Sequence, residues 1–228
     1  MEKAEFAKLF DHTILKATAT LSEVHSICDE AIKYGFCTVC VNSSMLAEVE
    51  TRLRGSGVLP ISVVGFALGA MSTAAKVEET RLALGEGARE IDMVVNLGWY
   101  FSGLEALVRG DIEALAKLTK QSQAKLKVII ETAYLNDDQI AELSLWSAKS
   151  GADFVKTSTG FGPRGASVND IRIMKGALVS AGLDQQVEIK ASGGIRTLDD
   201  VNKLVEAGAT RIGASASVDI YRRHLEAL

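Results

Sequence analysis

The segment Gly151-Ala-Asp-Phe-Val-Lys-Thr-Ser-Thr-Gly160 contains the pattern that decides the fold. A glycine and an alanine end a stretch of helical periodicity, a short apolar and β-branched run follows, and a second glycine closes the run. This order of residue types indicates a helix that ends at glycine and passes directly into a strand. Related junctions recur at Gly35, Gly87-Ala88 and Gly208-Ala209. We therefore interpret the chain as one supersecondary unit that is used repeatedly.

Short strand-like runs and helical stretches alternate along the whole chain. The runs are His12–Leu15, Cys37–Val41, Ile61–Phe66, Ile91–Val95, Val128–Thr132, Phe154–Thr157, Val187–Lys190 and Arg211–Gly213. Several helix starts carry a hydroxyl with an acidic side chain three residues later, as a capping box requires. These are Thr20 with Glu23, Ser167 with Asp170 and Thr197 with Asp200.

The length of 228 residues allows about 28 residues for each of eight units, which is enough for a strand, a helix and two loops. The pattern predicts one α/β domain over residues 1–228, a single (β/α)8 TIM barrel, with a short helix at Lys3–Phe10 before the first strand. A doubly wound open sheet has the same periodicity and stays an alternative at this point.

Composition excludes several classes of function. The 25 basic and 29 acidic residues give a net charge of −4, so nucleic acid is not expected as the main partner. The longest apolar stretch, Val58–Met71, is interrupted by Pro60 and glycines and is too short to span a membrane. The N-terminus lacks the apolar core of a signal peptide. Three cysteines, an odd count, favour free thiols and a cytoplasmic protein.

Two strands carry a lysine where an apolar residue is normal. Lys156 lies within the run Phe154–Thr157, and Lys190 repeats the feature one unit later. Side chains alternate across a strand, which directs Lys156, Lys190 and also Asp92 into the barrel. Burial and a neighbouring like charge both lower the pKa of a lysine. A neutral amine could then attack a carbonyl and form a Schiff base, with Asp92 as counter-ion or proton carrier.

Glycine-rich loops follow the seventh and eighth strands, at Ser192–Arg196 and Gly213–Ser217. Glycine lets the backbone approach an anion, and these two loops form the usual phosphate site of such barrels. Turn glycines without a ligand are the alternative for either loop alone.

The motifs taken together resemble the deoxyribose-phosphate aldolases. The resemblance is carried by Asp11-His-Thr13, Glu90–Asn96, Val155–Gly160 and Lys190–Arg196, and it runs from about Asp11 to Ser215. It implies a class I aldolase that needs no metal and no cofactor. Such an enzyme cleaves 2-deoxy-D-ribose 5-phosphate reversibly to acetaldehyde and D-glyceraldehyde 3-phosphate in deoxyribonucleoside catabolism. Sugar phosphate and aldehyde substrates would be its partners, and a homodimer is compatible with the resemblance.

The resemblance also implies individual roles. Lys156 would form the Schiff base, Lys190 would lower its pKa, and Asp92 would transfer protons with Lys190 and a water molecule. The substrate-binding positions would be Asp11 near the sugar hydroxyls, Cys40 near the aldehyde, and Thr159, Gly160, Gly193, Gly194, Gly213 and Ser215 in the phosphate loops.

Some positions depart from the family pattern. Ala17, Ser43 and Ala67 stand where the family often has proline, and Phe161 stands where a basic residue often follows Thr-Gly. The chain has only 2 prolines. Because proline restricts the unfolded chain, we expect its restoration at these loops to raise thermal stability.

Three rival interpretations have partial support in the sequence. Gly160-Phe-Gly162-Pro-Arg-Gly165 matches a dinucleotide-binding pattern, but Pro163 removes a backbone donor from the turn. Cys37 and Cys40 could form a redox or metal pair, but residues three apart in a strand point to opposite faces. A barrel that only binds or isomerises sugar phosphates would keep the glycine loops without needing two interior lysines.

Overall fold

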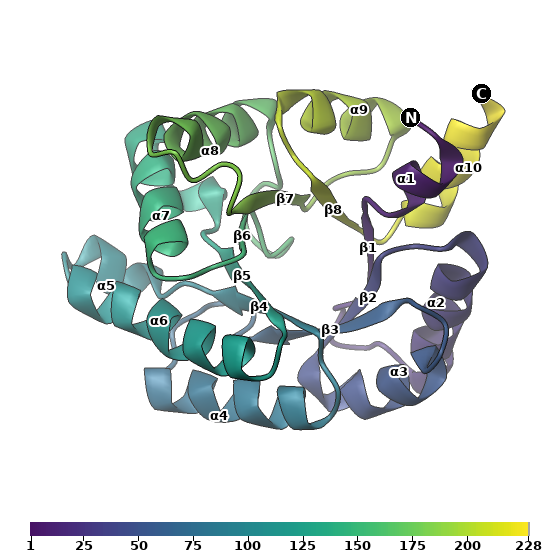
Figure 1. The fold of residues 1–228 in the computed structure, drawn as a ribbon, viewed down its shortest axis with the longest axis horizontal. Coiled ribbons are helices and arrows are strands. Elements are labelled where there is room, and N and C mark those ends of the chain that lie inside the picture. Colours follow the sequence, from purple (N-terminus) through teal and green to yellow (C-terminus); the bar gives the residue numbers. More distant parts are fainter. Residues whose placement is uncertain (228) are drawn as a thin grey trace.

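The computed structural model describes residues 1–227, and these form a closed barrel of eight parallel strands surrounded by helices (Figure 1). The strands pair in sequence order, and β1 also pairs with β8. They are β1 Phe10–Thr13, β2 Thr38–Val41, β3 Leu59–Val64, β4 Glu90–Val94, β5 Lys125–Ile129, β6 Phe154–Lys156, β7 Glu188–Ser192 and β8 Arg211–Ala214. The predicted single TIM barrel is confirmed, and the open sheet is wrong.

Helices cover the outside of the barrel between successive strands. They are α1 Lys3–Ala7, α2 Leu21–Tyr34, α3 Leu46–Leu53, α4 Thr73–Gly85, α5 Leu97–Phe101, α6 Glu105–Gln121, α7 Asp137–Lys149, α8 Val168–Ser180, α9 Leu198–Ala207 and α10 Ser217–Glu226. Two 3₁₀ turns, η1 Ser43–Met45 and η2 Thr132–Tyr134, follow β2 and β5. Figure 1 shows α1 beside α10, so the two ends of the chain lie close together.

The helix boundaries follow the local signals in the sequence. Full capping boxes form at Thr20, Ser167 and Thr197, as predicted. The glycines predicted to stop helices adopt positive φ, for example 71° at Gly35 and 98° at Gly151. Only glycine adopts this conformation without steric cost, so it fixes the point at which each helix turns into the next strand.

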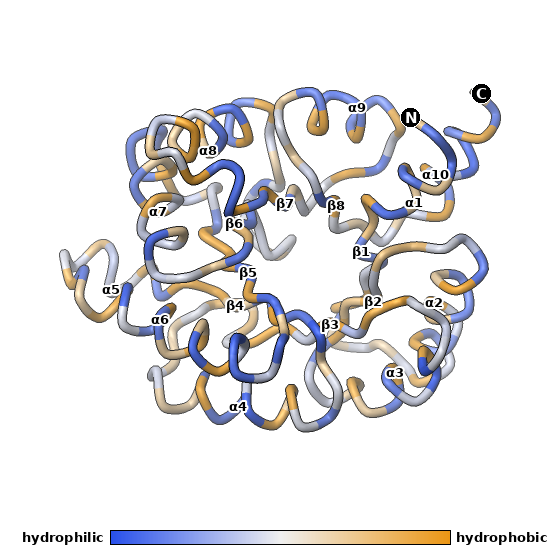
Figure 2. Tube along the Cα trace, in the orientation of Figure 1, coloured by the Kyte–Doolittle hydropathy of each residue, from blue (hydrophilic) through white to orange (hydrophobic). Residues whose placement is uncertain are grey.

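The main apolar core lies between the strands and the surrounding helices. Val128 and Val155 of the strands and Ile112, Leu143 and Met174 of the helices are all completely buried in it. Hydrophobic and hydrophilic colours alternate along the outer helices in Figure 2, as amphipathic helices packed on a barrel require.

Several element boundaries differ from the predictions; the third strand, for example, is Leu59–Val64 and not Ile61–Phe66. The first strand begins at Phe10, so the N-terminal helix ends at Ala7 and does not reach Phe10. The fifth strand is Lys125–Ile129, three residues earlier than Val128–Thr132. Its end is set by Glu131, whose φ of 50° cannot continue a strand. Its start was missed because Lys125 and Lys127 are charged.

No helix among residues 1–227 combines the length and the apolar character needed to cross a membrane.

Candidate active site at the carboxyl end of the barrel

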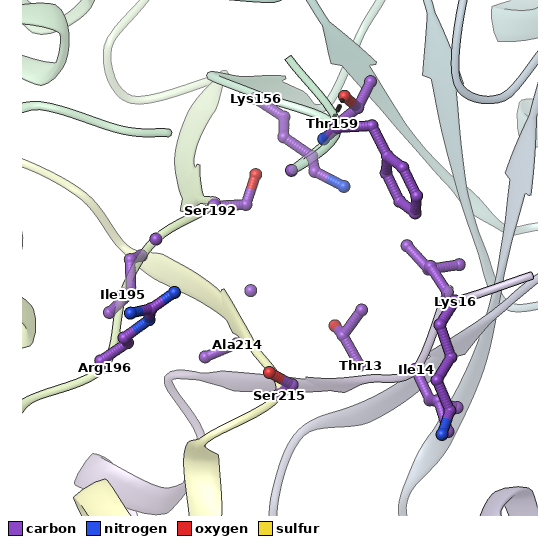
Figure 3. A pocket seen from close by; sticks show the side chains of 16 residues that line it. Thr13, Ile14, Lys16, Lys156, Thr159, Ser192, Ile195, Arg196, Ala214 and Ser215 are labelled. Carbon is purple, nitrogen blue, oxygen red and sulfur yellow. Dashed lines mark hydrogen bonds between the residues drawn. The ribbon is translucent and has the colours of Figure 1, made fainter. Parts of the chain in front are cut away.

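A cavity of about 370 Å³ opens where four loops leave the carboxyl ends of β1, β6, β7 and β8 (Figure 3). It is lined by Thr13, Ile14, Leu15, Lys16, Lys156, Thr159, Gly160, Phe161, Ser192, Gly193, Gly194, Ile195, Arg196, Gly213, Ala214 and Ser215. This end of a (β/α)8 barrel is where active sites occur. The cavity is therefore the candidate active site.

Lys156 projects its amine into this cavity from β6 (Figure 3). Its register partner on β7 is Lys190, so both side chains leave the barrel wall at the same height. They are 2% and 1% exposed. Lys156 lines the cavity, whereas Lys190 and Asp92 lie in the interior behind it. A small molecule in the cavity therefore meets the amine of Lys156 first.

The carboxylate of Asp92 connects the two lysines. Its Oδ2 atom accepts hydrogen bonds from Nζ of Lys156 and from Nζ of Lys190, both at 2.7 Å. Its Oδ1 atom accepts a third bond, from Nζ of Lys127 at 3.0 Å. One completely buried carboxylate thus binds three amines, as the alternation of side chains predicted for Lys156 and Lys190.

Further charges lie deeper in the barrel. Lys190 contacts Oδ2 of Asp11 at 2.5 Å, and Arg211 donates to Oδ1 of Asp11 at 2.8 Å. Glu90 forms ion pairs with Lys127 and Arg211. The connected network has three carboxylates and four cations. These are Asp11, Glu90 and Asp92 against Lys127, Lys156, Lys190 and Arg211.

The two lysines titrate in opposite directions. Burial lowers the pKa of Lys156, and the positive charge of Lys190 adds to this effect, which the carboxylate of Asp92 only partly offsets. Burial also acts on Lys190, but the carboxylates of Asp11 and Asp92 outweigh it and hold its pKa above the usual value. The prediction that like charge and burial lower a lysine pKa therefore fits Lys156 and is wrong for Lys190.

The acidic and thiol groups respond to the same field. Burial disfavours the Asp92 carboxylate, but Lys127, Lys156 and Lys190 outweigh it and hold its pKa well below the ordinary range. Asp11 behaves likewise, with Lys190 as its strongest cation. Burial raises the pKa of the Cys40 thiol to about 11. Both carboxylates are thus ionised at neutral pH, and Cys40 is a neutral thiol.

One side of the cavity is suited to an anion. Gly160, Gly193 and Gly194 line the cavity and have φ of 88°, 84° and 73°, conformations that glycine adopts readily. Ser215 precedes α10. Figure 3 shows Arg196 and Lys16 on opposite sides of the opening. The lining contains three basic side chains, Lys16, Lys156 and Arg196, and, among the described residues, no carboxylate, so it suits an anion on an otherwise acidic protein.

The opposite side is apolar. Leu15, Cys40, Ile61 and Val63 form a separate buried cluster inside the barrel, and Phe66 packs against it. Phe161 lies edge-on to Phe66, with ring centroids 5.4 Å apart, and is 58% exposed at the cavity wall. The charged side chains of β4 to β8 therefore face an apolar cluster that comes from β2, β3 and the loop after β1.

Six of the eight predicted substrate-binding residues line the cavity, and they are Thr159, Gly160, Gly193, Gly194, Gly213 and Ser215. Asp11 and Cys40 lie in the interior instead, Asp11 beneath Lys190 and Cys40 in the apolar cluster. Gly213 has a packing reason as well, because a Cβ atom there would lie 3.0 Å from Cε of Lys190. Because Gly213 has no side chain, the Lys190 side chain fits beside it.

Sequence reasoning missed the deeper ion network. Lys127 alternates with Lys125 along β5, but the strand was placed too late to include either residue. Glu90 and Arg211 lie at strand starts, where an exposed charge is the usual interpretation. Extending the fourth and fifth strands toward their starts would have included Glu90 and Lys127, whereas Arg211 already lay within the predicted eighth strand.

The rival motifs are explained by packing. A Cβ atom at Gly165 would lie 1.9 Å from the carbonyl oxygen of Gly193, so this glycine is required by contact between two loops. Cys37 and Cys40 are free thiols. Within residues 1–227 no group of three or more His, Cys, Asp or Glu side chains is placed to hold a metal ion.

Comparison with known proteins gives a consistent result. A family model described as DeoC/LacD family aldolase matches residues 6–223. Deoxyribose-phosphate aldolase 2 of Staphylococcus aureus MRSA252 is 50% identical over 214 residues, covering 94% of each chain. The deoxyribose-phosphate aldolase of Mycoplasmoides pirum is 46% identical, covering 96% of this chain and 98% of its own. The Aeropyrum pernix enzyme, described as having a unique tetrameric structure, superimposes with a TM-score of 0.90 at 30% identity, covering 100% of this chain and 94% of the other.

Proposed function

We propose, from the premise that this chain belongs to the DeoC/LacD aldolase family, that it is a deoxyribose-phosphate aldolase of class I. It would cleave 2-deoxy-D-ribose 5-phosphate to acetaldehyde and D-glyceraldehyde 3-phosphate, and catalyse the reverse addition, in deoxyribonucleoside catabolism. One observation carries the proposal. Of the three lysines that bind Asp92, only Lys156 lines the cavity, and it is the one whose pKa burial and Lys190 lower.

The geometry supports a Schiff-base sequence on Lys156. Its neutral amine attacks C1 of the open-chain sugar, and loss of water together with uptake of one proton leaves a protonated imine. The C2–C3 bond then breaks as the C3 hydroxyl loses its proton, and the bonding electrons move into the imine to give an enamine. D-Glyceraldehyde 3-phosphate leaves, C2 of the enamine takes a proton, and hydrolysis releases acetaldehyde.

Asp92 and Lys190 support the proton transfers in this proposal. The Asp92 carboxylate lies 2.7 Å from both amines, so it is placed to accept a proton that leaves Lys156. Lys190 stays charged and orients Asp92, and a water molecule completes the path to the substrate. General acid–base assistance of this kind contributes on the order of 10²–10⁴-fold to rate.

The remaining cavity groups would select the phosphorylated end. Gly160, Gly193, Gly194 and Gly213 leave space for an anion, with Ser215 near the start of α10 and Arg196 at the edge. Asp11 would act through Lys190, and Cys40 would contribute to the apolar wall near the two-carbon fragment.

We further propose a single domain over residues 1–228, a cytoplasmic location and a homo-oligomer, a homodimer being the first state to test by light scattering. The free thiols support the location. Leu228 lies outside the described residues.

Borohydride reduction in the presence of acetaldehyde, followed by peptide mapping, tests the mechanism. We expect one reduced two-carbon adduct on Lys156. An adduct on another lysine would overturn the choice of nucleophile, and no adduct would overturn the Schiff base. The Lys156→Leu variant should lose turnover and keep phosphate binding. Unchanged turnover in this variant would favour a barrel that binds or isomerises sugar phosphates.

A further inference from the structure

Glu131 is a buried acidic residue whose place the reaction sequence does not explain. It lies two residues beyond the end of β5 and is only 4% exposed. Its φ of 50° lies in the left-handed region, which non-glycine residues adopt rarely. Such conformations persist where surrounding contacts enforce them, and they concentrate at functional sites.

One oxygen of Glu131 connects to the loop that follows Lys156. Oε2 accepts a hydrogen bond from the backbone N–H of Thr159 at 3.1 Å and another from the Thr159 hydroxyl. The same hydroxyl oxygen accepts from the backbone N–H of Phe161 at 3.0 Å. A continuous chain of hydrogen bonds therefore runs from Glu131 through Thr159 to Phe161.

The backbone on either side joins the same two segments. The N–H of Ile130 donates to the carbonyl of Lys156 at 3.0 Å, and the N–H of Thr132 donates to the carbonyl of Thr157 at 2.9 Å. Glu131 thus sits between two backbone bonds, and its side chain extends the connection beyond the end of β6.

The second oxygen of Glu131 has no hydrogen-bond partner among the described residues. It faces Gly162, where a Cβ atom would come within 3.0 Å of it. It borders a small cavity of about 70 Å³ that shares Thr159 and Phe161 with the main cavity. No ion pair within residues 1–227 involves Glu131. A buried carboxylate without a cation is unfavourable for folding, which argues for a functional reason.

We propose that Glu131 is a positioning residue that holds Thr159, Gly160 and Phe161 in the form that lines the substrate cavity. This inference rests on the proposed function and deepens it, because the held loop borders the anion side. Thr159 lies between Glu131 and the main cavity, so Glu131 acts through the loop. It therefore sets the affinity for the phosphorylated substrate and leaves the amine chemistry of Lys156 intact.

Kinetic variants test the role. Glu131→Ala should raise KM for 2-deoxy-D-ribose 5-phosphate about tenfold or more, as expected for loss of hydrogen bonds to a charged group. In this variant, the rate at which borohydride traps the acetaldehyde adduct on Lys156 should stay within about twofold of the rate in the parent protein. Glu131→Gln should recover most of the affinity, because an amide oxygen accepts the same two bonds. Thr159→Val loses the hydroxyl bond to Glu131 and keeps the N–H bond, so it should raise KM in the same direction, and the double variant should raise KM by less than the product of the two single effects.

Hydrogen exchange of residues 157–165 gives a readout that does not depend on catalysis. Exchange should accelerate in Glu131→Ala and Thr159→Val and stay at the parent level in Glu142→Ala. The last variant is a matched control, since Glu142 also accepts a hydroxyl bond, from Tyr100 at 2.7 Å, but lies outside the cavity.

Three results would overturn the inference. Unchanged exchange in Glu131→Ala shows that the carboxylate does not hold the loop. Equal loss of affinity in Glu131→Gln and Glu131→Ala shows that charge, and not hydrogen-bond acceptance, matters. Loss of trapping in Glu131→Ala places the residue in the amine chemistry. If the unmodified protein itself traps no acetaldehyde, the proposed function fails, and the exchange experiment still decides the role of Glu131.

Discussion

Lys156 and Lys190 are register partners on neighbouring strands, and their Nζ atoms stand at an equal 2.7 Å from one oxygen of Asp92. The pair is therefore coupled through a single atom. A change in the charge of either lysine therefore changes how strongly this oxygen stabilises the protonated form of the other lysine. This coupling makes the pH dependence of Schiff-base formation a direct measure of the network.

Replacing Lys190 with Met should move Schiff-base formation to higher pH. Lys190 lowers the pKa of Lys156, and without it Asp92 and Asp11 have one cation fewer to balance them. The pKa of Lys156 then rises, so its neutral amine appears only at more alkaline pH. The measurement is the rate of acetaldehyde trapping against pH. The coupling would be contradicted if the rise of the trapping rate with pH stayed at the same pH or moved to lower pH.

Replacing Asp92 with Asn should have the opposite effect on the same curve. The carboxylate raises the pKa of Lys156, so its removal lets this pKa fall further and moves the rise of the trapping rate to lower pH. Turnover should nevertheless drop by about 10²–10⁴-fold, because the proton path is lost. Removing one partner of a buried pair costs about 3–5 kcal/mol, so circular dichroism must first show that the variant is folded. An alkaline shift would refute the assignment.

Arg196 and Lys16 should differ in their effect on phosphate recognition. Arg196 is exposed at the cavity edge, whereas Lys16 is already paired with Glu23. We expect Arg196→Gln to raise KM for the phosphorylated sugar by about tenfold, in line with loss of a charge-assisted hydrogen bond. Lys16→Gln should change KM by less, and neither should change trapping of acetaldehyde. Equal increases in KM for the two variants would show that the phosphate is not bound preferentially at the Arg196 side of the cavity.

Proline at two loop positions should stabilise the fold. Ser43 begins η1 after Asn42 with ψ of 148°, a conformation that a following proline favours. Ala17 follows Lys16 in a turn closed by the Ala19 N–H to Lys16 carbonyl bond at 3.0 Å, where proline is preferred. Each substitution should add about 0.4–1 kcal/mol.

Thermal unfolding of Ser43→Pro and Ala17→Pro checks this expectation, with Thr18→Pro as the control. Proline is disfavoured at the next position of such a turn, so the control should lower the midpoint. A lower midpoint in both test variants would reject the idea that the missing prolines loosen these loops. The hydrogen bond from Ser43 to Glu79 at 3.2 Å is lost in the first variant and limits its gain.

The periodicity of the sequence predicted the barrel because each unit carries its own boundary signals. Capping boxes at Thr20, Ser167 and Thr197 and positive-φ glycines such as Gly35 act within a few residues. Alternation then directed Lys156 and Lys190 inward without knowledge of other strands. Local rules were sufficient here because the decisive interactions are local.

The parts that escaped prediction depend on contacts between distant strands. The pKa of Lys190 rises because Asp11, about 180 residues away in the chain, lies against it. The buried charges Lys127, Glu90 and Arg211 look like exposed strand-end residues until the barrel closes around them. Glu131 ends β5 through a backbone angle that no local motif announces.

The surplus of one cation in the barrel interior bears on how the carbon–carbon bond breaks. Asp11, Glu90 and Asp92 are matched in number by Lys127, Lys190 and Arg211, which leaves Lys156 as the unmatched group. The interior is therefore neutral while Lys156 is a free amine and becomes positive when the protonated imine forms. Bond cleavage to the enamine removes this charge from the imine nitrogen, while the proton of the C3 hydroxyl passes through water toward Asp92. The protein environment thus favours the electron shift of the reaction itself, because the shift moves electrons onto the imine nitrogen in an interior where cations outnumber carboxylates by one.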